Sequence, residues 1–145
     1  MFKNIENGIF DIKFKETKDY YKNNPICDCY NCRNYQINVK KYLPKLDAFL
    51  SQFGIDSARP DEMGSEYFEE DNSIQYFFVA YTVNGKIIKS GNEITLLDNG
   101  LSLNISISNN YYPNGHEIED YFTITILNIV LPWLLDGEYP DKPEK

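Results

Sequence analysis

The chain has 145 residues, of which 42% are hydrophobic and 15% aromatic, and its formal net charge is −8. This length supplies one hydrophobic core but not two, so we expect a single domain over residues 1–135. The acidic, proline-containing residues 136–145 are predicted to form a mobile tail. The negative charge argues against nucleic acid or an anionic membrane as partner, because clustered lysines and arginines bind those.

The N-terminal residues form no apolar leader, and no segment approaches the roughly 20 apolar residues that span a bilayer. We therefore expect a cytoplasmic protein. The acidic excess is regional: residues 1–59 carry ten Lys/Arg against seven Asp/Glu, whereas residues 60–145 carry four against fifteen. No Lys or Arg occurs in residues 60–85 or 90–141, which predicts a mainly negative surface on the second part of the chain.

The first predicted element is an edge strand over residues 8–16. Phe10, Ile12 and Phe14 alternate there with polar residues, which places the apolar side chains on one face. Residues 17–25 show no period and are predicted to form a loop. A helical segment follows at about residues 33–53, because apolar residues recur every three or four positions. Pro44 either kinks this helix or starts a second one in its first turn, and Gly54 ends it.

The remaining chain is predicted to form antiparallel strands. Residues 61–72 suggest a short irregular strand, and residues 74–83 a buried one that turns at Asn84-Gly85 into residues 86–89. A second hairpin spans residues 94–107 around residues 98–100. A last strand at residues 120–130 precedes Leu131-Pro132-Trp133, which we expect to leave the sheet.

These elements predict an α+β fold, with a mainly antiparallel sheet of five to seven strands and the helical segment 33–53 packed on one face. The sheet and helix faces together predict the core. Its expected members are Phe10, Ile12, Phe14, Val39, Leu46, Leu50, Phe78, Leu103, Ile105, Ile124 and Ile126.

All three cysteines of the protein lie within six residues, as Cys27, Cys29 and Cys32. Thiolates at this spacing can converge on one Zn²⁺, so a structural zinc site is one interpretation of the cluster, and no cofactor at all is the other. The chain's one histidine, His116, is the candidate fourth ligand; Asp28 is a weaker oxygen ligand, and water would leave the site open.

Two other interpretations of the cysteines remain open. A Cys29-x-x-Cys32 pair ahead of a helix can have a lowered thiol pKa and act in thiol chemistry, although no βαβ pattern surrounds it. Alternatively, the cysteines have no metal or redox role, and Cys32 packs at the start of the helix as a small apolar residue.

Several short motifs of the chain form a recognisable pattern: Cys27-x-Cys29-x-x-Cys32-Arg33-Asn34-Tyr35, Leu43-Pro44-x-Leu46-x-x-Phe49-Leu50, Phe53-Gly54-Ile55-Asp56, Pro60 and Leu131-Pro132-Trp133. In these motifs the chain resembles a group of small uncharacterised bacterial proteins. The resemblance covers residues 8–61 and 119–136 and implies that the cysteines, the helix and the C-terminal strand belong to one recurring fold; no activity is attached to the group.

Two functional hypotheses follow. The first is a non-catalytic binding protein whose acidic surface engages a basic protein partner, for example as an immunity or inhibitor protein. The second is a zinc-dependent or thiol-based enzyme centred on the cysteines. Net charge and the absence of recognisable catalytic motifs in the sequence favour the first.

Overall fold

A computed structural model describes residues 1–23, 27–109 and 120–135 of the chain. Within these ranges three helices and eight strands follow one another, and all strand pairs are antiparallel. The α+β class is thus confirmed, with one strand more than the largest number expected. The elements are β1 (Phe2–Ile5), β2 (Gly8–Ile12), α1 (Phe14–Asn23), α2 (Tyr30–Tyr42), α3 (Pro44–Ser51), β3 (Glu62–Phe68), β4 (Ser73–Lys89), β5 (Ile94–Asp98), β6 (Leu101–Asn109), β7 (Tyr121–Leu127) and β8 (Ile129–Pro132).

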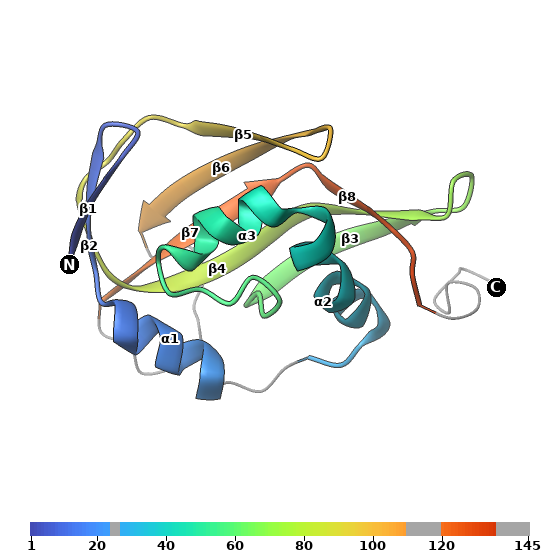
Figure 1. The fold of residues 1–145 in the computed structure, drawn as a ribbon, viewed down its shortest axis with the longest axis horizontal. Coiled ribbons are helices and arrows are strands. Elements are labelled where there is room, and N and C mark those ends of the chain that lie inside the picture. The colour runs from blue at the N-terminus through green and yellow to red at the C-terminus, as the bar shows by residue number, and fades with distance from the viewer. Residues whose placement is uncertain (24–26, 110–119, 136–145) are drawn as a thin grey trace.

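Strand β4 is the centre of the sheet and runs through almost its whole length (Figure 1). One edge of β4 pairs with β3 and then β2, and the other edge pairs with β8 and then β7. The order β1-β2-β4-β7-β6-β5 gives the main path of the sheet. Because β4 has 17 residues and pairs with four other strands, it links both ends of the molecule.

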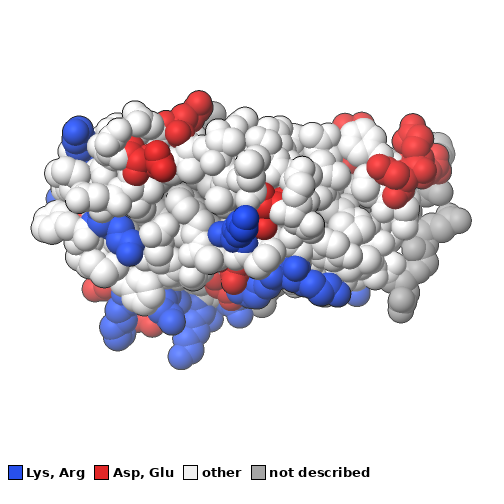
Figure 2. Space-filling model, turned by 45° about the horizontal axis from the view of Figure 1, so that its top comes forward, with Lys and Arg blue, Asp and Glu red and all other residues white. Residues whose placement is uncertain are grey.

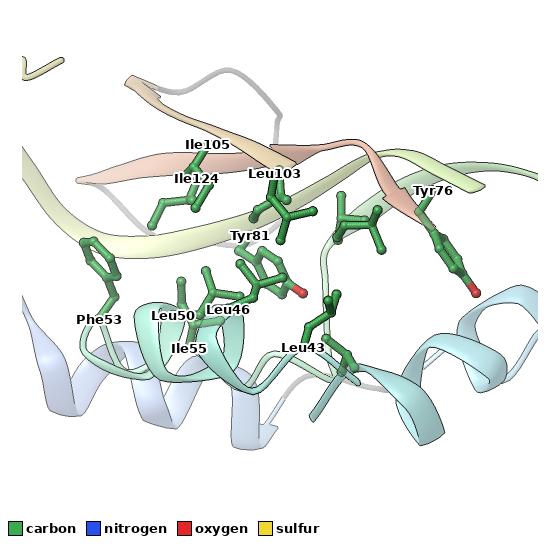
Figure 3. Close-up of a cluster of buried hydrophobic side chains, with 14 of the residues drawn as sticks. Leu43, Leu46, Leu50, Phe53, Ile55, Tyr76, Tyr81, Leu103, Ile105 and Ile124 are labelled. Atoms are coloured by element: carbon green, nitrogen blue, oxygen red, sulfur yellow. The ribbon is translucent and has the colours of Figure 1, made fainter. Parts of the chain in front are cut away.

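The core lies between the helices and one face of the sheet (Figure 3). The segment from α2 to the residues after α3 contributes one side of it, and β4, β6 and β7 contribute the other. Of the residues expected in the core, nine are buried, whereas Phe78 is partly buried and Phe14 is 37% exposed. The side chains labelled in the close-up are Leu43, Leu46, Leu50, Phe53, Ile55, Tyr76, Tyr81, Leu103, Ile105 and Ile124.

Side chains of helix α1 form hydrogen bonds with backbone groups of β4 in the stretch between its β3 and β2 partners. The Tyr21 hydroxyl accepts from the Thr82 backbone N–H and donates to the Thr82 carbonyl, both at 2.7 Å. The Asn84 N–H donates to Thr17 Oγ1 at 3.0 Å. Buried backbone groups need such partners, so side chains of α1 replace a missing stretch of strand.

This helix corrects the prediction for residues 8–25, since the strand ends at Ile12 and the predicted loop is helical from Phe14 to Asn23. Thr17, Tyr20 and Tyr21 are buried at helical spacing, and all three side chains carry a hydroxyl group. Among so many polar residues the sequence shows no apolar helical face, and this side of α1 is recognisable only from its contacts with β4.

The predicted turn at Asn84-Gly85 is wrong, because β4 passes straight through it. Gly85 pairs with Ile12 in β2 and has φ +150°. A Cβ at Gly85 would lie 2.0 Å from the Asp11 carbonyl oxygen, so glycine serves close strand approach here. The second predicted hairpin is confirmed, with a two-residue turn at Asn99-Gly100 in which both residues have positive φ.

The helical segment divides at Pro44, the first residue of α3, as one of the two expected outcomes. Leu43 precedes α3 without a capping side chain, and the buried Asp98 of β5 supplies the cap. Its carboxylate accepts from the Leu46 N–H at 2.8 Å. A residue 52 positions away therefore satisfies this helix start.

The C-terminal strand is interrupted at Asn128, which has φ +75°, and continues as β8. Contrary to expectation, Leu131 and Pro132 stay in the sheet and pair with β4. Pro132 is tolerated because it is the last residue of β8, and the next N–H, that of Trp133, donates to the Asn72 carbonyl.

None of the helices in the described ranges has the length and apolar character needed to cross a bilayer. The predicted tail at residues 136–145 lies outside the described residues.

Candidate metal centre

The three cysteines converge at the N-terminus of α2. Their Sγ atoms all lie within 4.8 Å of one another, and they form no disulfide. Cys27 and Cys29 are exposed, and Cys32 is partly buried in the first turn of α2. The cluster anticipated from the sequence thus exists as a group of neighbouring thiols.

Local backbone geometry explains this convergence. Cys29 is the N-cap of α2 and has an extended backbone, so its side chain turns back over the first helical turn. Its Sγ accepts from the Cys32 N–H at 3.5 Å. An N-cap and the residue three positions later face each other in any helix, which brings Cys29 and Cys32 together.

The surroundings change the thiol pKa values in opposite directions. Burial acts to raise the pKa of Cys29, but hydrogen bonds from the Cys32 and Asn31 backbone and from the Cys27 and Cys32 thiols lower it overall. Burial, followed by its hydrogen bonds to Cys27 and Cys29, raises the pKa of Cys32 well above its ordinary value. Of these two thiols, the surroundings of Cys29 favour the thiolate and those of Cys32 favour the protonated thiol.

The cysteines form one wall of a cavity of about 280 Å³ between α2 and the start of β3. The opposite wall comes from residues just before and within β3, and it includes two carboxylates. The side-chain carbonyl oxygen of Asn31 is buried without a hydrogen-bond partner, while its amide donates to Ser65 at 2.8 Å. The lining residues are Cys27, Cys29, Asn31, Cys32, Pro60, Asp61, Glu62, Met63 and Ser65.

The sulphur positions fit a small thiophilic cation. A zinc–sulphur bond of about 2.3 Å places tetrahedral sulphurs about 3.8 Å apart. The observed limit of 4.8 Å requires the thiols to close by no more than about one ångström. Three exposed or partly exposed side chains can make that movement by rotating about χ1.

The fourth ligand predicted from the sequence is not placed by this geometry. His116 lies outside the described residues. Asp28 is exposed and does not belong to the metal-competent group, which in the described part of the chain consists of the three cysteines. Asn31, Asp61 and Glu62 line the same cavity as the cysteines and carry side-chain oxygen atoms, so they are the alternative candidates for a fourth ligand.

Long-range hydrogen bonds hold α2 in place beneath the cysteines. Asn34 accepts from the Leu134 N–H at 2.8 Å and donates to the Pro132 carbonyl at 3.1 Å. Asn38 donates to the same carbonyl at 3.1 Å. Segments far apart in the sequence, the cysteine-bearing helix and the Leu-Pro-Trp ending, are thus joined directly.

The sequence analysis did not identify Asn31, Asp61 or Glu62 as part of the site. Asp61 and Glu62 belong to an acidic stretch with no metal-ligand spacing, and only the pairing of β3 with β4 brings them to α2. Asn31 lies inside the cysteine motif, and this position was the one feature of the sequence that could have indicated its place in the site.

Comparison with protein-family models, curated proteins and solved structures finds no match to this chain. The resemblance to the group of bacterial proteins therefore stays a prediction.

Proposed function

We propose that this is a non-catalytic binding protein that holds a soft metal ion, Zn²⁺ in the first instance, through Cys27, Cys29 and Cys32. The convergence of the three Sγ atoms within 4.8 Å is the observation that carries the proposal. Thiolate ligands select Zn²⁺ or Cu⁺ over harder ions such as Mg²⁺ and Ca²⁺.

The ion would serve a local structural role. Cys27 belongs to the segment that leads into α2, whereas Cys29 and Cys32 belong to the cap and first turn of that helix. One ion bound to all three fixes that segment against the helix. Binding also replaces the thiol protons, which removes the hydrogen-bond competition among the three sulphurs.

A binding role is better supported than a hydrolytic one. Three thiolates around Zn²⁺ leave a net negative centre, and Asp61 and Glu62 add further negative charge at the cavity. Negative charge opposes the ionisation of a metal-bound water, which hydrolytic zinc enzymes require. In the parts of the chain that are described, neither histidine nor lysine lines this cavity.

Elemental analysis of protein purified without chelators or metal-affinity resin tests the proposal, with a thiol count on the same sample. We expect about one zinc per chain and thiols protected from alkylation until a chelator is added. Substituting Co²⁺ then reports coordination, since thiolate charge-transfer bands appear only when sulphur binds the ion.

Matched variants assign the ligands. Cys27→Ser, Cys29→Ser and Cys32→Ser should each weaken Co²⁺ binding at least about tenfold, whereas Asp28→Asn, between two of the ligands, should leave it unchanged. Glu62→Gln and Asn31→Ala test the fourth position. Metal-free protein with three freely titrating thiols would contradict the proposal, and a Cys29–Cys32 disulfide in its place would favour thiol chemistry.

Charge distribution favours a second binding function, for a basic protein partner. Figure 2 shows a cluster of Asp and Glu, without Lys or Arg beside it, at the end of the molecule where Figure 1 places the β3–β4 hairpin; most Lys and Arg lie along another side. Glu66, Glu69, Glu70 and Asp71 are exposed there. Such a field speeds the association of cationic proteins and makes it sensitive to salt.

A further inference from the structure

The face of the sheet that points away from the core can be followed from the strand registers. Tyr67, Ile74 and Leu131 are neighbours across β3, β4 and β8 and pack with the core. One position away along each strand, a second row of cross-strand neighbours consists of Glu66 in β3, Gln75 in β4 and Val130 in β8. Successive side chains alternate between faces, so this second row lies on the outer face.

Two phenylalanines lie on the same outer face. The register of β3 with β4 shifts at Gly64/Ser65, so Phe77 is the extra residue of a bulge. A Cβ on Gly64 would lie 2.4 Å from a Phe77 ring atom and 2.8 Å from one of Phe78. Both rings therefore lie over Gly64, and Phe77 remains 45% exposed.

Two aliphatic side chains extend this surface. Ile126 pairs with Val79, so Leu127 stands opposite Phe78, and it is 40% exposed. Val130, opposite Gln75, is 37% exposed. We name Phe77, Phe78, Leu127 and Val130 the outer-face patch. Clustered exposed apolar side chains of this kind mark interaction sites more often than scattered ones do.

The border of the outer-face patch is acidic. Glu66 is exposed on β3, on the outer face, and the β3–β4 hairpin adds Glu69, Glu70 and Asp71. No lysine or arginine occurs anywhere between residues 60 and 85. An apolar centre surrounded by negative charges is complementary to a partner whose apolar residues are flanked by lysine or arginine.

We propose that the outer-face patch is the docking site for a cationic, amphipathic segment of a partner protein, in which Phe77 and Phe78 form the apolar anchor. This inference rests on the second binding function proposed above and assigns its surface. A second copy of the chain fits less well, because docking two such patches brings their acidic borders together. Nucleic acid and anionic lipid are repelled by the same borders.

A library of random linear peptides displayed on phage, selected on the purified full-length protein at low salt, supplies the probe. We expect selected peptides to place lysine or arginine beside aromatic or aliphatic residues. A synthesised, fluorescently labelled peptide is then titrated by anisotropy, and raising the salt concentration should weaken its binding.

Matched variants locate the binding surface. Phe77→Ser should weaken peptide binding at least about tenfold, as loss of a central aromatic anchor does. Ile37→Ser is the control, because Ile37 is 48% exposed but lies on α2. Glu66→Lys should weaken binding and its salt dependence more than Glu93→Lys, an exposed charge in the β4–β5 connection. Circular dichroism checks that each variant is folded.

The outcomes separate the function from the surface. If selection yields no peptides, or yields neutral or acidic ones, the proposed function fails and the docking site fails with it. If basic peptides bind but Phe77→Ser and Ile37→Ser behave alike, the function survives and the outer-face patch is overturned. A dimer in sedimentation that Phe77→Ser dissociates would also overturn it, in favour of a second copy.

Discussion

Helix α2 is held at its N-terminus by residues adjacent in sequence and along its buried side by residues far away. The cysteine cluster is formed by six consecutive residues and is partly exposed. The buried side instead carries Asn34 and Tyr35. Asn34 forms hydrogen bonds with the backbone of Pro132 and Leu134, about a hundred positions later in the chain, and the Tyr35 hydroxyl forms one with the Tyr81 hydroxyl at 2.6 Å.

These two regions obey different physical constraints. A metal site needs only ligand atoms at the right spacing, which a helix cap supplies locally. A buried polar network needs every donor and acceptor satisfied in a medium of low dielectric constant, which requires the whole fold. We therefore expect mutations in the network to affect stability strongly and mutations in the cysteines to affect mainly metal binding.

The largest expected effect is loss of stability at alkaline pH. Burial raises the pKa of Tyr21, Tyr35 and Tyr81, so in the folded protein these hydroxyls stay neutral where free tyrosines, with a pKa of about 10, ionise. Stability is intact below about pH 10 and falls above it, by about 4 kcal/mol at pH 11 for three groups. Urea unfolding below pH 10 and at pH 11 measures this difference in stability.

Tyr35→Phe is the control for this pH dependence. It should reduce the slope of unfolding free energy against pH above pH 10 by about one proton equivalent, even though it also lowers stability at neutral pH. An unchanged slope would mean that Tyr35 does not contribute, contrary to its complete burial.

Asn34→Ala should have the next largest effect. It removes the acceptor of the Leu134 N–H and one donor to the Pro132 carbonyl, and we expect a loss of about 3 kcal/mol in unfolding free energy. Denaturant unfolding measures it against Asn104→Ala, an exposed position in β6 that should change stability by less than about 0.5 kcal/mol. Equal losses would show that the contact between α2 and β8 is not important for stability.

Asp98→Ala tests the cap that β5 supplies to α3. Loss of the carboxylate leaves the Leu46 N–H without its partner and should cost about 1–2 kcal/mol. Asp98→Asn keeps an oxygen acceptor and should retain most of the stability. If both variants lose the same amount, the negative charge rather than the hydrogen bond is what matters.

Replacing all three cysteines with serine should have the smallest effect on the metal-free fold, below about 0.5 kcal/mol, because two of the side chains are exposed. Thermal unfolding with and without added Zn²⁺ measures this. Zinc should raise the midpoint of the parent protein and leave that of the variant unchanged. A zinc-dependent shift in the variant would place the binding site elsewhere.

Elements whose pattern is carried by neighbouring residues were predictable. The alternation in β6, the turn at Asn99-Gly100 and the cysteine cluster each depend on residues within a few positions. The helix α1 was missed because its buried side consists of Thr17, Tyr20 and Tyr21, whose polar tips look like those of a loop. Their role as partners of β4 depends on residues some 60 positions later.

The sequence by itself determined the α+β class, the apolar sides of most strands and the convergence of three thiols, since periodicity and helix capping act over a few residues. Tertiary structure decided that Asn84-Gly85 lies inside a strand and that Asp61 and Glu62 line the same cavity as the cysteines. It also decided that the two phenylalanines share the outer face with Leu127 and Val130. Strand pairing sets these relations, because register joins residues that no local pattern connects.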